Sequence, residues 1–273
     1  MTTPAGTFDG LAAGNEHDRP VLLLHGFPEA APEWEHQLVT LPSAGYRAVA
    51  PDQRGYSPGV RPEAAGEYRM ELLVADVLAI ADALGWHRFD LVGHDWGAAV
   101  AWVVAGKHPD RLRTLTAVSV PHPAPLLAAL REDEDQRQRS AYIKLFRQAG
   151  YAEQRLMENN GEALRQIYGD GVPRSRVEDY LARLSEPGAL TAALNWYRAL
   201  GSGEDLGKIT VPTMYVWSTE DVAVGSTAAL ATADWVTGPY HFEMLEDVSH
   251  WIPEEAGETL SKLLLEHLAA HNR

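Results

Sequence analysis

The chain has 273 residues, of which 45% are hydrophobic, so it is long enough for one large folded core. Its formal net charge of −15 argues against a nucleic-acid partner, because binding to a phosphate backbone depends on clustered Lys and Arg. It has no cysteine, which excludes disulfides, thiolate metal sites and a cysteine nucleophile.

Short apolar runs alternate with helix-patterned segments over the first 120 residues. Strands are expected at 21–25, 46–51, 89–93 and 115–120, and helices at 33–44, 70–84 and 96–107. Nearly continuous apolar strands separated by helices are typical of a parallel sheet that is covered on both faces. This part of the chain therefore predicts an α/β fold with a mostly parallel sheet and right-handed crossovers.

The pattern becomes helical from about Leu126 to Leu206, where no β-branched run appears. Strand character returns at 213–218 and 241–245, and a final helix is expected over 253–270. A helical block between strands of one sheet indicates an inserted lid, because the sheet needs its later strands to complete the core. We therefore expect a core formed by 1–124 and 207–273 and an all-helical lid at 125–206.

The segment Gly93-His94-Asp95-Trp96-Gly97 stands between a predicted strand and a predicted helix. Glycines two positions before and after a central residue are the steric requirement of a nucleophile elbow, which turns too tightly for side chains there. Asp95 would then be the nucleophile. In the alternative interpretation, Asp95 only caps the helix that follows.

The segment His25-Gly26-Phe27-Pro28 follows the first predicted strand. In α/β-hydrolases this loop supplies one backbone N–H of the oxyanion hole, and the residue after the nucleophile supplies the other. The donors would be Phe27 and Trp96, with His25 and Pro28 beside them. A simple turn that ends the strand is the alternative.

The segment Asp52-Gln53-Arg54, after the strand at 46–51, is interpreted as structural. We expect a turn with a local Asp–Arg pair that shapes the rim of the site.

Partners for the nucleophile are expected in the chain order nucleophile, acid, histidine. Asp221 follows the strand at 213–218, and its neighbour Glu220 is the weaker candidate; His250 follows the strand at 241–245. His250 would act as general base, and Asp221 would fix its tautomer and orientation. No HExxH and no paired His/carboxylate spacing occurs, so neither a metal nor another cofactor is expected.

A carboxylate nucleophile changes the chemistry expected of the elbow. Attack on a carbonyl would give a high-energy anhydride, whereas attack on a saturated carbon with a leaving group gives an alkyl ester of Asp95. Water activated by His250 would then hydrolyse that ester. A halide leaving group needs N–H donors, while an epoxide oxygen needs an acid such as tyrosine.

Taken together, HGFP, DQRG, GHDWG, the late aspartate and Ser-His-Trp resemble the epoxide hydrolases of the α/β-hydrolase fold over nearly the whole chain. The resemblance implies two lid tyrosines that hold the epoxide oxygen. They correspond to Tyr142 in Tyr-Ile-Lys-Leu-Phe and Tyr197 in Asn-Trp-Tyr-Arg. It also implies a cis peptide bond between Phe27 and Pro28. For either tyrosine, simple packing is the alternative.

Two related families share the aspartate elbow. Haloalkane dehalogenases also have Trp after the nucleophile, where its indole binds halide, but they often have Asn in place of Phe27 and lack the tyrosine pair. Fluoroacetate dehalogenases have arginines just after the nucleophile, where this chain has Gly97-Ala98-Ala99. The sequence therefore favours an epoxide hydrolase, with a haloalkane dehalogenase that uses Trp96 as the alternative.

The expected substrates are a hydrophobic small-molecule epoxide and water, and a monomer or a homodimer is expected. A binder without activity is a further alternative, although such a protein has no reason to keep all of Asp95, Asp221 and His250. The first 20 residues lack a signal peptide pattern, and no apolar run approaches the roughly 20 residues that span a membrane. The expectation is a cytoplasmic protein without membrane insertion.

Overall fold

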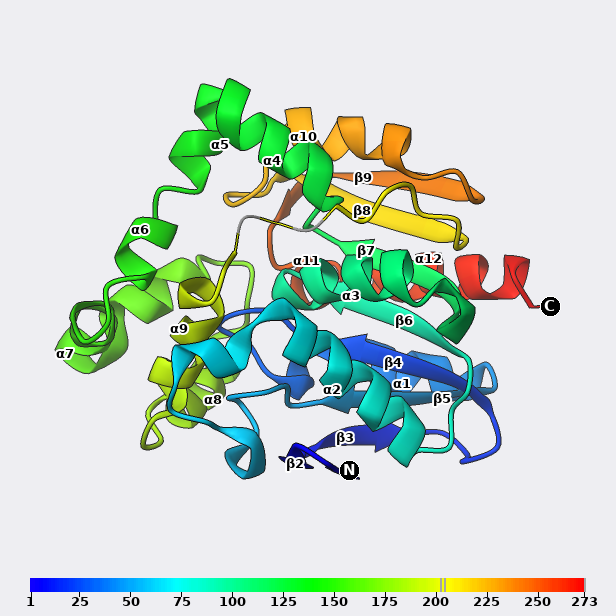
Figure 1. The fold of residues 1–273 in the computed structure, drawn as a ribbon, viewed down its shortest axis with the longest axis horizontal. Helices are drawn as coiled ribbons and strands as arrows, with labels where there is room; N and C mark the ends of the chain where they lie inside the picture. Colours follow the sequence, from blue (N-terminus) through cyan, green and yellow to red (C-terminus); the bar gives the residue numbers. More distant parts are fainter. Residues whose placement is uncertain (202, 204, 273) are drawn as a thin grey trace.

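A computed structural model describes residues 1–201, 203 and 205–272, and these contain a seven-stranded sheet between two layers of helices (Figure 1). The strand order is β3-β5-β4-β6-β7-β8-β9, in which β3 is antiparallel to β5 and all other neighbours are parallel. The strands are β3 (Gly10–Ala13), β4 (Arg19–Leu24), β5 (Tyr46–Pro51), β6 (Phe89–His94), β7 (Leu112–Val118), β8 (Thr213–Glu220) and β9 (Tyr240–Ser249). The predicted α/β fold is confirmed.

Helices cover both faces of this sheet because the side chains of its strands alternate between two apolar layers. In β4, Val21 and Leu23 belong to the core that contains α1 (Glu35–Ser43) and α12 (Gly257–Ala270). The intervening Leu22 and Leu24 face the core that contains α2 (Met70–Ala83) and α3 (Trp96–Lys107). Burial on both faces explains why β4 is continuously apolar from Val21 to Leu24.

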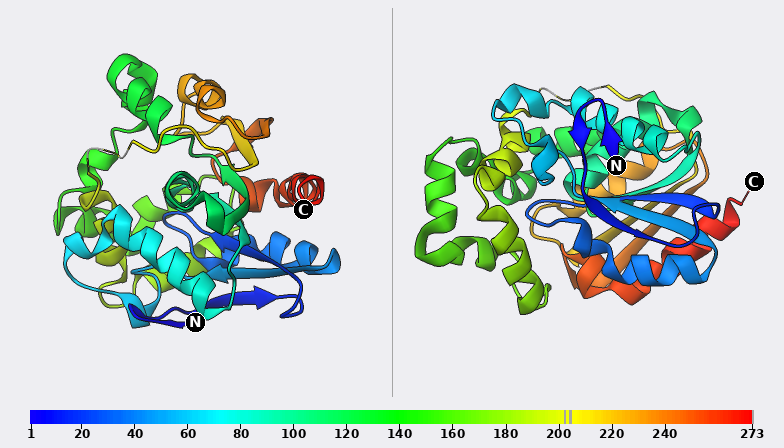
Figure 2. Two further views of the ribbon diagram at one scale, coloured as in Figure 1. Left: turned by 45° about the vertical axis from the view of Figure 1, so that its right-hand side comes forward. Right: turned by 90° about the horizontal axis from the view of Figure 1, so that it is seen from below.

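Among the described residues between β7 and β8, six helices follow one another: α4 (Pro123–Glu132), α5 (Glu134–Arg139), α6 (Ile143–Phe146), α7 (Tyr151–Ile167), α8 (Arg174–Leu184) and α9 (Ala189–Arg198). Helices α6 to α8 form a group to one side of the sheet (Figure 2). Residues 158–161 of α7 have non-helical backbone angles, so the helix is interrupted there.

The lid boundaries remain a prediction, since α4 begins at Pro123, inside the expected core segment, and positions 202 and 204 lie outside the described residues. Within the described part of the chain, no helix is long and apolar enough to cross a membrane.

Several elements were not predicted. Strands β1 (Thr2–Thr3) and β2 (Gly6–Thr7) pair with each other, and β3 forms by pairing with β5, although its sequence Gly-Leu-Ala-Ala has low strand propensity. Helix α10 (Ser226–Ala231) follows β8, and the expected final helix is split into α11 (Ile252–Glu255) and α12. Short 3₁₀ segments occur at Ala31–Trp34, Pro58–Val60, Ala65–Tyr68, Pro109–Arg111 and Thr232–Trp235.

Candidate active site

Asp95 occupies a strained turn between β6 and α3. Its backbone has φ 47° and ψ −116°, a conformation that costs a non-glycine residue about 1–3 kcal/mol. A Cβ atom on Gly97 would lie 2.0 Å from the Leu24 carbonyl oxygen, and one on Gly93 would lie 2.3 Å from that of Gly97. Within the described residues the Asp95 side chain makes no capping hydrogen bond to α3, so the capping interpretation is wrong.

The two carboxylate oxygens of Asp95 have different neighbours. The Phe27 backbone N–H donates a hydrogen bond to Oδ1 at 2.8 Å, from the loop that contains the cis Phe27–Pro28 bond. His250 Nε2 lies 3.6 Å from Oδ2. Oδ1 is therefore held by the backbone, and Oδ2 is the oxygen that lies beside the histidine.

His250 is linked to Asp221 through its other ring nitrogen. Nδ1 lies 2.9 Å from Asp221 Oδ1 and 3.0 Å from Oδ2, and both residues are buried. Asp221 Oδ1 also accepts hydrogen bonds from the backbone N–H groups of Ala223 and Val224 at 2.8 and 2.9 Å. A carboxylate can only accept, so Nδ1 carries a proton and the His250 ring is oriented with Nε2 toward Asp95.

Electrostatics in this buried site favour an imidazolium between two carboxylates. Burial opposes ionisation of Asp95, but the hydrogen bond and charge of His250 outweigh it and lower the pKa of Asp95. The pKa of Asp221 is also lowered, because the His250 charge and hydrogen bond outweigh burial. For His250, burial is outweighed by the charges and hydrogen bonds of Asp221 and Asp95, so its pKa is raised well above the ordinary value.

Both predicted tyrosines lie beside the nucleophile. Tyr197, in α9, is buried, with its ring centroid 5.3 Å from that of Phe27 and 5.1 Å from that of Trp96. Half-buried Tyr142 precedes α6, and its ring lies 6.1 Å from that of Tyr197. Burial and the Asp95 charge raise the pKa of Tyr142, and burial and Tyr142 raise that of Tyr197, so both hydroxyls stay protonated at neutral pH.

His25 and Pro28 have mainly structural contacts. The Gln53 N–H donates to His25 Nε2 at 3.0 Å, so the proton of the ring is on Nδ1, which donates to the Gly26 carbonyl at 2.8 Å. Burial lowers the pKa of His25 to about 4 and keeps the ring neutral. Both ring nitrogens are thus engaged by backbone, and neither is left for a substrate. The Pro28 carbonyl accepts from the Tyr168 hydroxyl at 2.8 Å.

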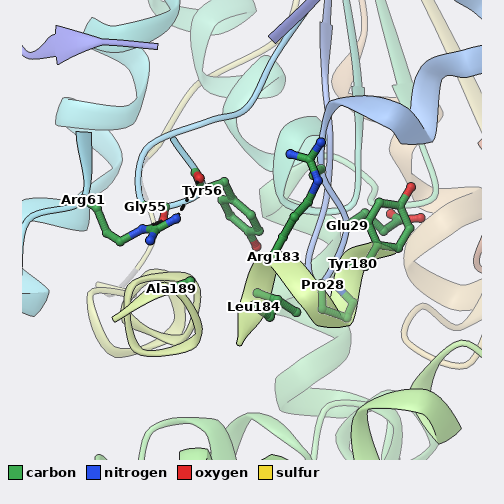
Figure 3. A pocket seen from close by; sticks show the side chains of 10 residues that line it. Pro28, Glu29, Gly55, Tyr56, Arg61, Tyr180, Arg183, Leu184 and Ala189 are labelled. Carbon is green, nitrogen blue, oxygen red and sulfur yellow. Dashed lines mark hydrogen bonds between the residues drawn. The ribbon is translucent and has the colours of Figure 1, made fainter. Parts of the chain in front are cut away.

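The predicted local pair between Asp52 and Arg54 is wrong. Arg54 makes two hydrogen bonds, of 2.6 and 2.7 Å, to Asp76 in α2, because its side chain extends away from the turn into the helix layer. Asp52 instead accepts from Arg183 of α8 at 3.0 Å. Figure 3 shows Arg183 beside Tyr56 in a pocket between α8 and the core loops. Asp52 therefore fastens a helix of the inserted block to the core.

A buried group of Glu29, Glu33 and His94 was missed by the sequence analysis, although the four-residue spacing of the glutamates directly after HGFP was visible. Their ligand-type atoms lie within 4.8 Å of one another. His94 Nε2 donates to the His250 carbonyl at 2.9 Å, so the Nδ1 lone pair faces Glu29 Oε2 at 3.1 Å. Burial and the Glu33 charge raise the pKa of Glu29 to about 8. A proton on Glu29 can therefore be donated to the His94 ring at neutral pH.

This assignment predicts a pH-dependent effect of Glu29→Gln on stability. Because the pKa of Glu29 rises from 4.5 to about 8 on folding, its stabilising contribution is complete below pH 4.5 and is lost as the pH rises through 8. Glutamine keeps a donor for His94 at every pH. Thermal unfolding measures the difference in melting temperature between Glu29→Gln and the unmodified protein. We expect this difference to shift in favour of the variant as the pH is raised from 5 to about 9.

Glu16→Gln, at an exposed position, is the control and should show no such trend. A difference between Glu29→Gln and the unmodified protein that stays constant over this range would contradict the proton on Glu29.

The chain resembles known proteins along nearly its whole length. The family defined by the alpha/beta hydrolase fold matches residues 19–256. The AB hydrolase superfamily protein YfhM of Bacillus subtilis (strain 168) is 36% identical over 276 residues, which cover 98% of this chain and 96% of YfhM. Epoxide hydrolase A of Mycobacterium tuberculosis (strain ATCC 25618 / H37Rv) is 32% identical, covering 94% and 92%. The crystal structure of epoxide hydrolase VrEH1 from Vigna radiata has a TM-score of 0.86 at 29% identity, covering 99% and 97%.

Proposed function

The chain belongs to the α/β-hydrolase fold family, in the branch that includes epoxide hydrolases, and we propose that it hydrolyses an epoxide to a vicinal diol through an ester on Asp95. The observation that carries this proposal is the position of Tyr142 and Tyr197 beside an aspartate nucleophile. The surrounding rings of Phe27, Trp96 and Phe146 suit a hydrophobic epoxide.

In the first half-reaction, Asp95 Oδ2 attacks a ring carbon, and the bond from that carbon to the epoxide oxygen breaks. The oxygen takes a proton from the tyrosine pair as its negative charge develops. A tyrosine whose pKa is raised by burial remains protonated until the substrate draws the proton away. The product of this step is a hydroxyalkyl ester of Asp95, with Oδ1 as its carbonyl oxygen.

In the second half-reaction, His250 Nε2 removes a proton from water, which attacks Cγ of Asp95. Negative charge develops on Oδ1, the oxygen that receives the Phe27 N–H, and the Trp96 N–H is the second donor of this oxyanion hole. The intermediate collapses by breaking the bond between Cγ and Oδ2, and the leaving alkoxide takes the proton that His250 had removed from water. The diol keeps Oδ2, and the water oxygen remains in Asp95.

Formation of the ester also prepares His250 for its role as base. In the free protein the charges of Asp221 and Asp95 raise the pKa of His250, which favours the imidazolium. Esterification removes the negative charge of Asp95, so the pKa of His250 falls; the proton it gives up replaces the one that the tyrosine pair lost to the epoxide oxygen, and the neutral ring can accept a proton from water. The order of the two half-reactions is thus built into the charges of the site.

A haloalkane dehalogenase with the same nucleophile is the second candidate, supported by Trp96 next to Asp95. Against it, the Trp96 ring packs edge-to-face against the ring of Tyr197, with 5.1 Å between the ring centroids. The tryptophan that would bind halide is therefore in contact with one of the two tyrosines that ring opening would use. Halide release from haloalkanes, measured beside epoxide opening, separates the two activities.

A single turnover in ¹⁸O-labelled water tests the covalent mechanism. With the protein in excess over a styrene-type epoxide, we expect an unlabelled diol, because its new oxygen comes from Asp95 Oδ2, and we expect ¹⁸O in the peptide that contains Asp95. Mass spectrometry of the diol and of that peptide provides both measurements.

Repeated turnovers are the control, since label must then pass from Asp95 into the diol. Labelled diol in the first turnover would mean that water attacks the epoxide directly, and it would exclude the ester.

A further inference from the structure

Ser119 lies at the contact between the acid and the histidine, outside the residues assigned to the reaction so far. Its Oγ donates a hydrogen bond to Asp221 Oδ2 at 2.6 Å and lies 2.8 Å from His250 Nδ1. With 3.0 Å between Nδ1 and Oδ2, the three atoms form a closed triangle. Ser119 is completely buried, so no solvent competes for its hydroxyl.

The backbone of Ser119 is held in an unusual conformation. It follows β7 directly and has φ 68°, which lies in the left-handed region and costs a non-glycine residue about 1 kcal/mol or more. The Ser119 N–H donates to the Val216 carbonyl at 2.8 Å, and the Tyr215 hydroxyl donates to the Ser119 carbonyl at 2.7 Å. Both partners belong to β8, the strand that ends just before Asp221.

The proton positions in the triangle follow from the donor inventory. Ionised Asp221 can only accept, so the single hydroxyl proton of Ser119 points to Oδ2. The oxygen of Ser119 then faces the Nδ1 proton of His250, which it shares with the carboxylate. The hydroxyl hydrogen bond also acts against burial to lower the pKa of Asp221. Ser119 thus contacts both members of the pair and keeps the acid ionised.

We propose that Ser119 is a positioning residue for the hydrolysis step, and that its hydroxyl fixes Asp221 and His250 relative to each other and tempers the basicity of the carboxylate. This inference rests on the proposed function, because it assigns Ser119 to the half-reaction in which His250 is the base. The hydroxyl is not a nucleophile: it acts through Asp221 and His250.

The test compares Ser119→Ala with Thr116→Val. Thr116 belongs to β7 and is buried like Ser119, and its hydroxyl has no hydrogen-bond partner within the described residues, so its removal leaves the Asp221–His250 pair intact. Ser119→Gly is a second variant, because glycine adopts φ 68° without strain if the alanine protein does not fold.

We expect Ser119→Ala to form the Asp95 ester at the unmodified rate and to hydrolyse it about 10-fold more slowly, as for one lost hydrogen bond to a charged group. Its pH profile for hydrolysis should also move. Without the hydroxyl, Asp221 is more basic and holds the imidazolium more tightly, so the acid limb shifts to higher pH. The other titratable groups that face His250 are Asp95 and His94, and both remain.

A titration of ¹⁵N-labelled histidines by NMR in the free protein gives an independent readout, with the His250 signal assigned from His250→Gln. The midpoint for His250 should be higher in Ser119→Ala than in the unmodified protein, and unchanged in Thr116→Val. An unchanged midpoint, or equal slowing of both half-reactions, would overturn the positioning role. If no epoxide forms an ester with the unmodified protein, the proposed function fails, while the titration still decides the role of Ser119.

Discussion

Replacing His250 by glutamine should convert the protein into one that forms the Asp95 ester and stops there. Glutamine provides no general base, so hydrolysis should slow by about 10²–10⁴-fold. Ring opening uses Asp95 and the tyrosines, and it should continue. Intact-protein mass spectrometry after mixing with an epoxide should show one added substrate mass, and digestion should place that mass on the peptide that contains Asp95.

The matched control is His241→Gln, which removes a half-exposed histidine from β9, the strand that leads to His250. It should turn over substrate without accumulating an adduct. If His250→Gln gives neither an adduct nor turnover, His250 is needed for ring opening. This would contradict the proposal that ring opening uses only Asp95 and the tyrosines. Undiminished turnover of His250→Gln would show that His250 is not the general base.

The fold was predicted well from the sequence, and candidate site residues could be proposed from it, because each of these features has a local pattern. The elbow is recognisable from Gly93 and Gly97, whose missing side chains leave room for backbone atoms 2.0–2.3 Å from the Cβ positions. Strand β5 was predicted at its observed bounds, Tyr46–Pro51, since a strand buried on both sides is mostly apolar in sequence. Asp221 and His250 were predicted from chain order, and the structure places Asp221 beside His250 and His250 beside Asp95.

The missed features depend on contacts between distant segments. Arg54 pairs with Asp76 and Asp52 with Arg183, and only the fold determines which acid each arginine reaches. Ser119 is hydrogen-bonded to Asp221, which lies 102 positions away in the sequence. Its role depends on the direction of its hydroxyl, which no sequence pattern encodes. Strand β3 forms because the edge of β5 offers free backbone groups, not because its own residues favour a strand.

Removing both tyrosine hydroxyls should abolish epoxide opening but leave displacement of a halide nearly unaffected. In Tyr142→Phe with Tyr197→Phe, the epoxide oxygen would leave without a donor while its negative charge develops. One lost donor of this kind slows a reaction by about 10²–10³-fold, and we expect a larger loss for the pair. Stopped-flow measurement of ester formation with an aryl epoxide gives the rate of ring opening directly.

A halide leaves as a stable anion and needs no proton, so any dehalogenation by the unmodified protein should be nearly unchanged in the double variant. Tyr151→Phe is the control, since this tyrosine begins α7 in the same helical block and is 51% exposed. Ester formation from epoxide that persists in the double variant would remove the tyrosines from the mechanism. Loss of halide release together with ring opening would mean that the rings shape the pocket instead of donating a proton. Only a selective loss of ring opening identifies the hydroxyls as the acid, and with it the leaving group as an epoxide oxygen.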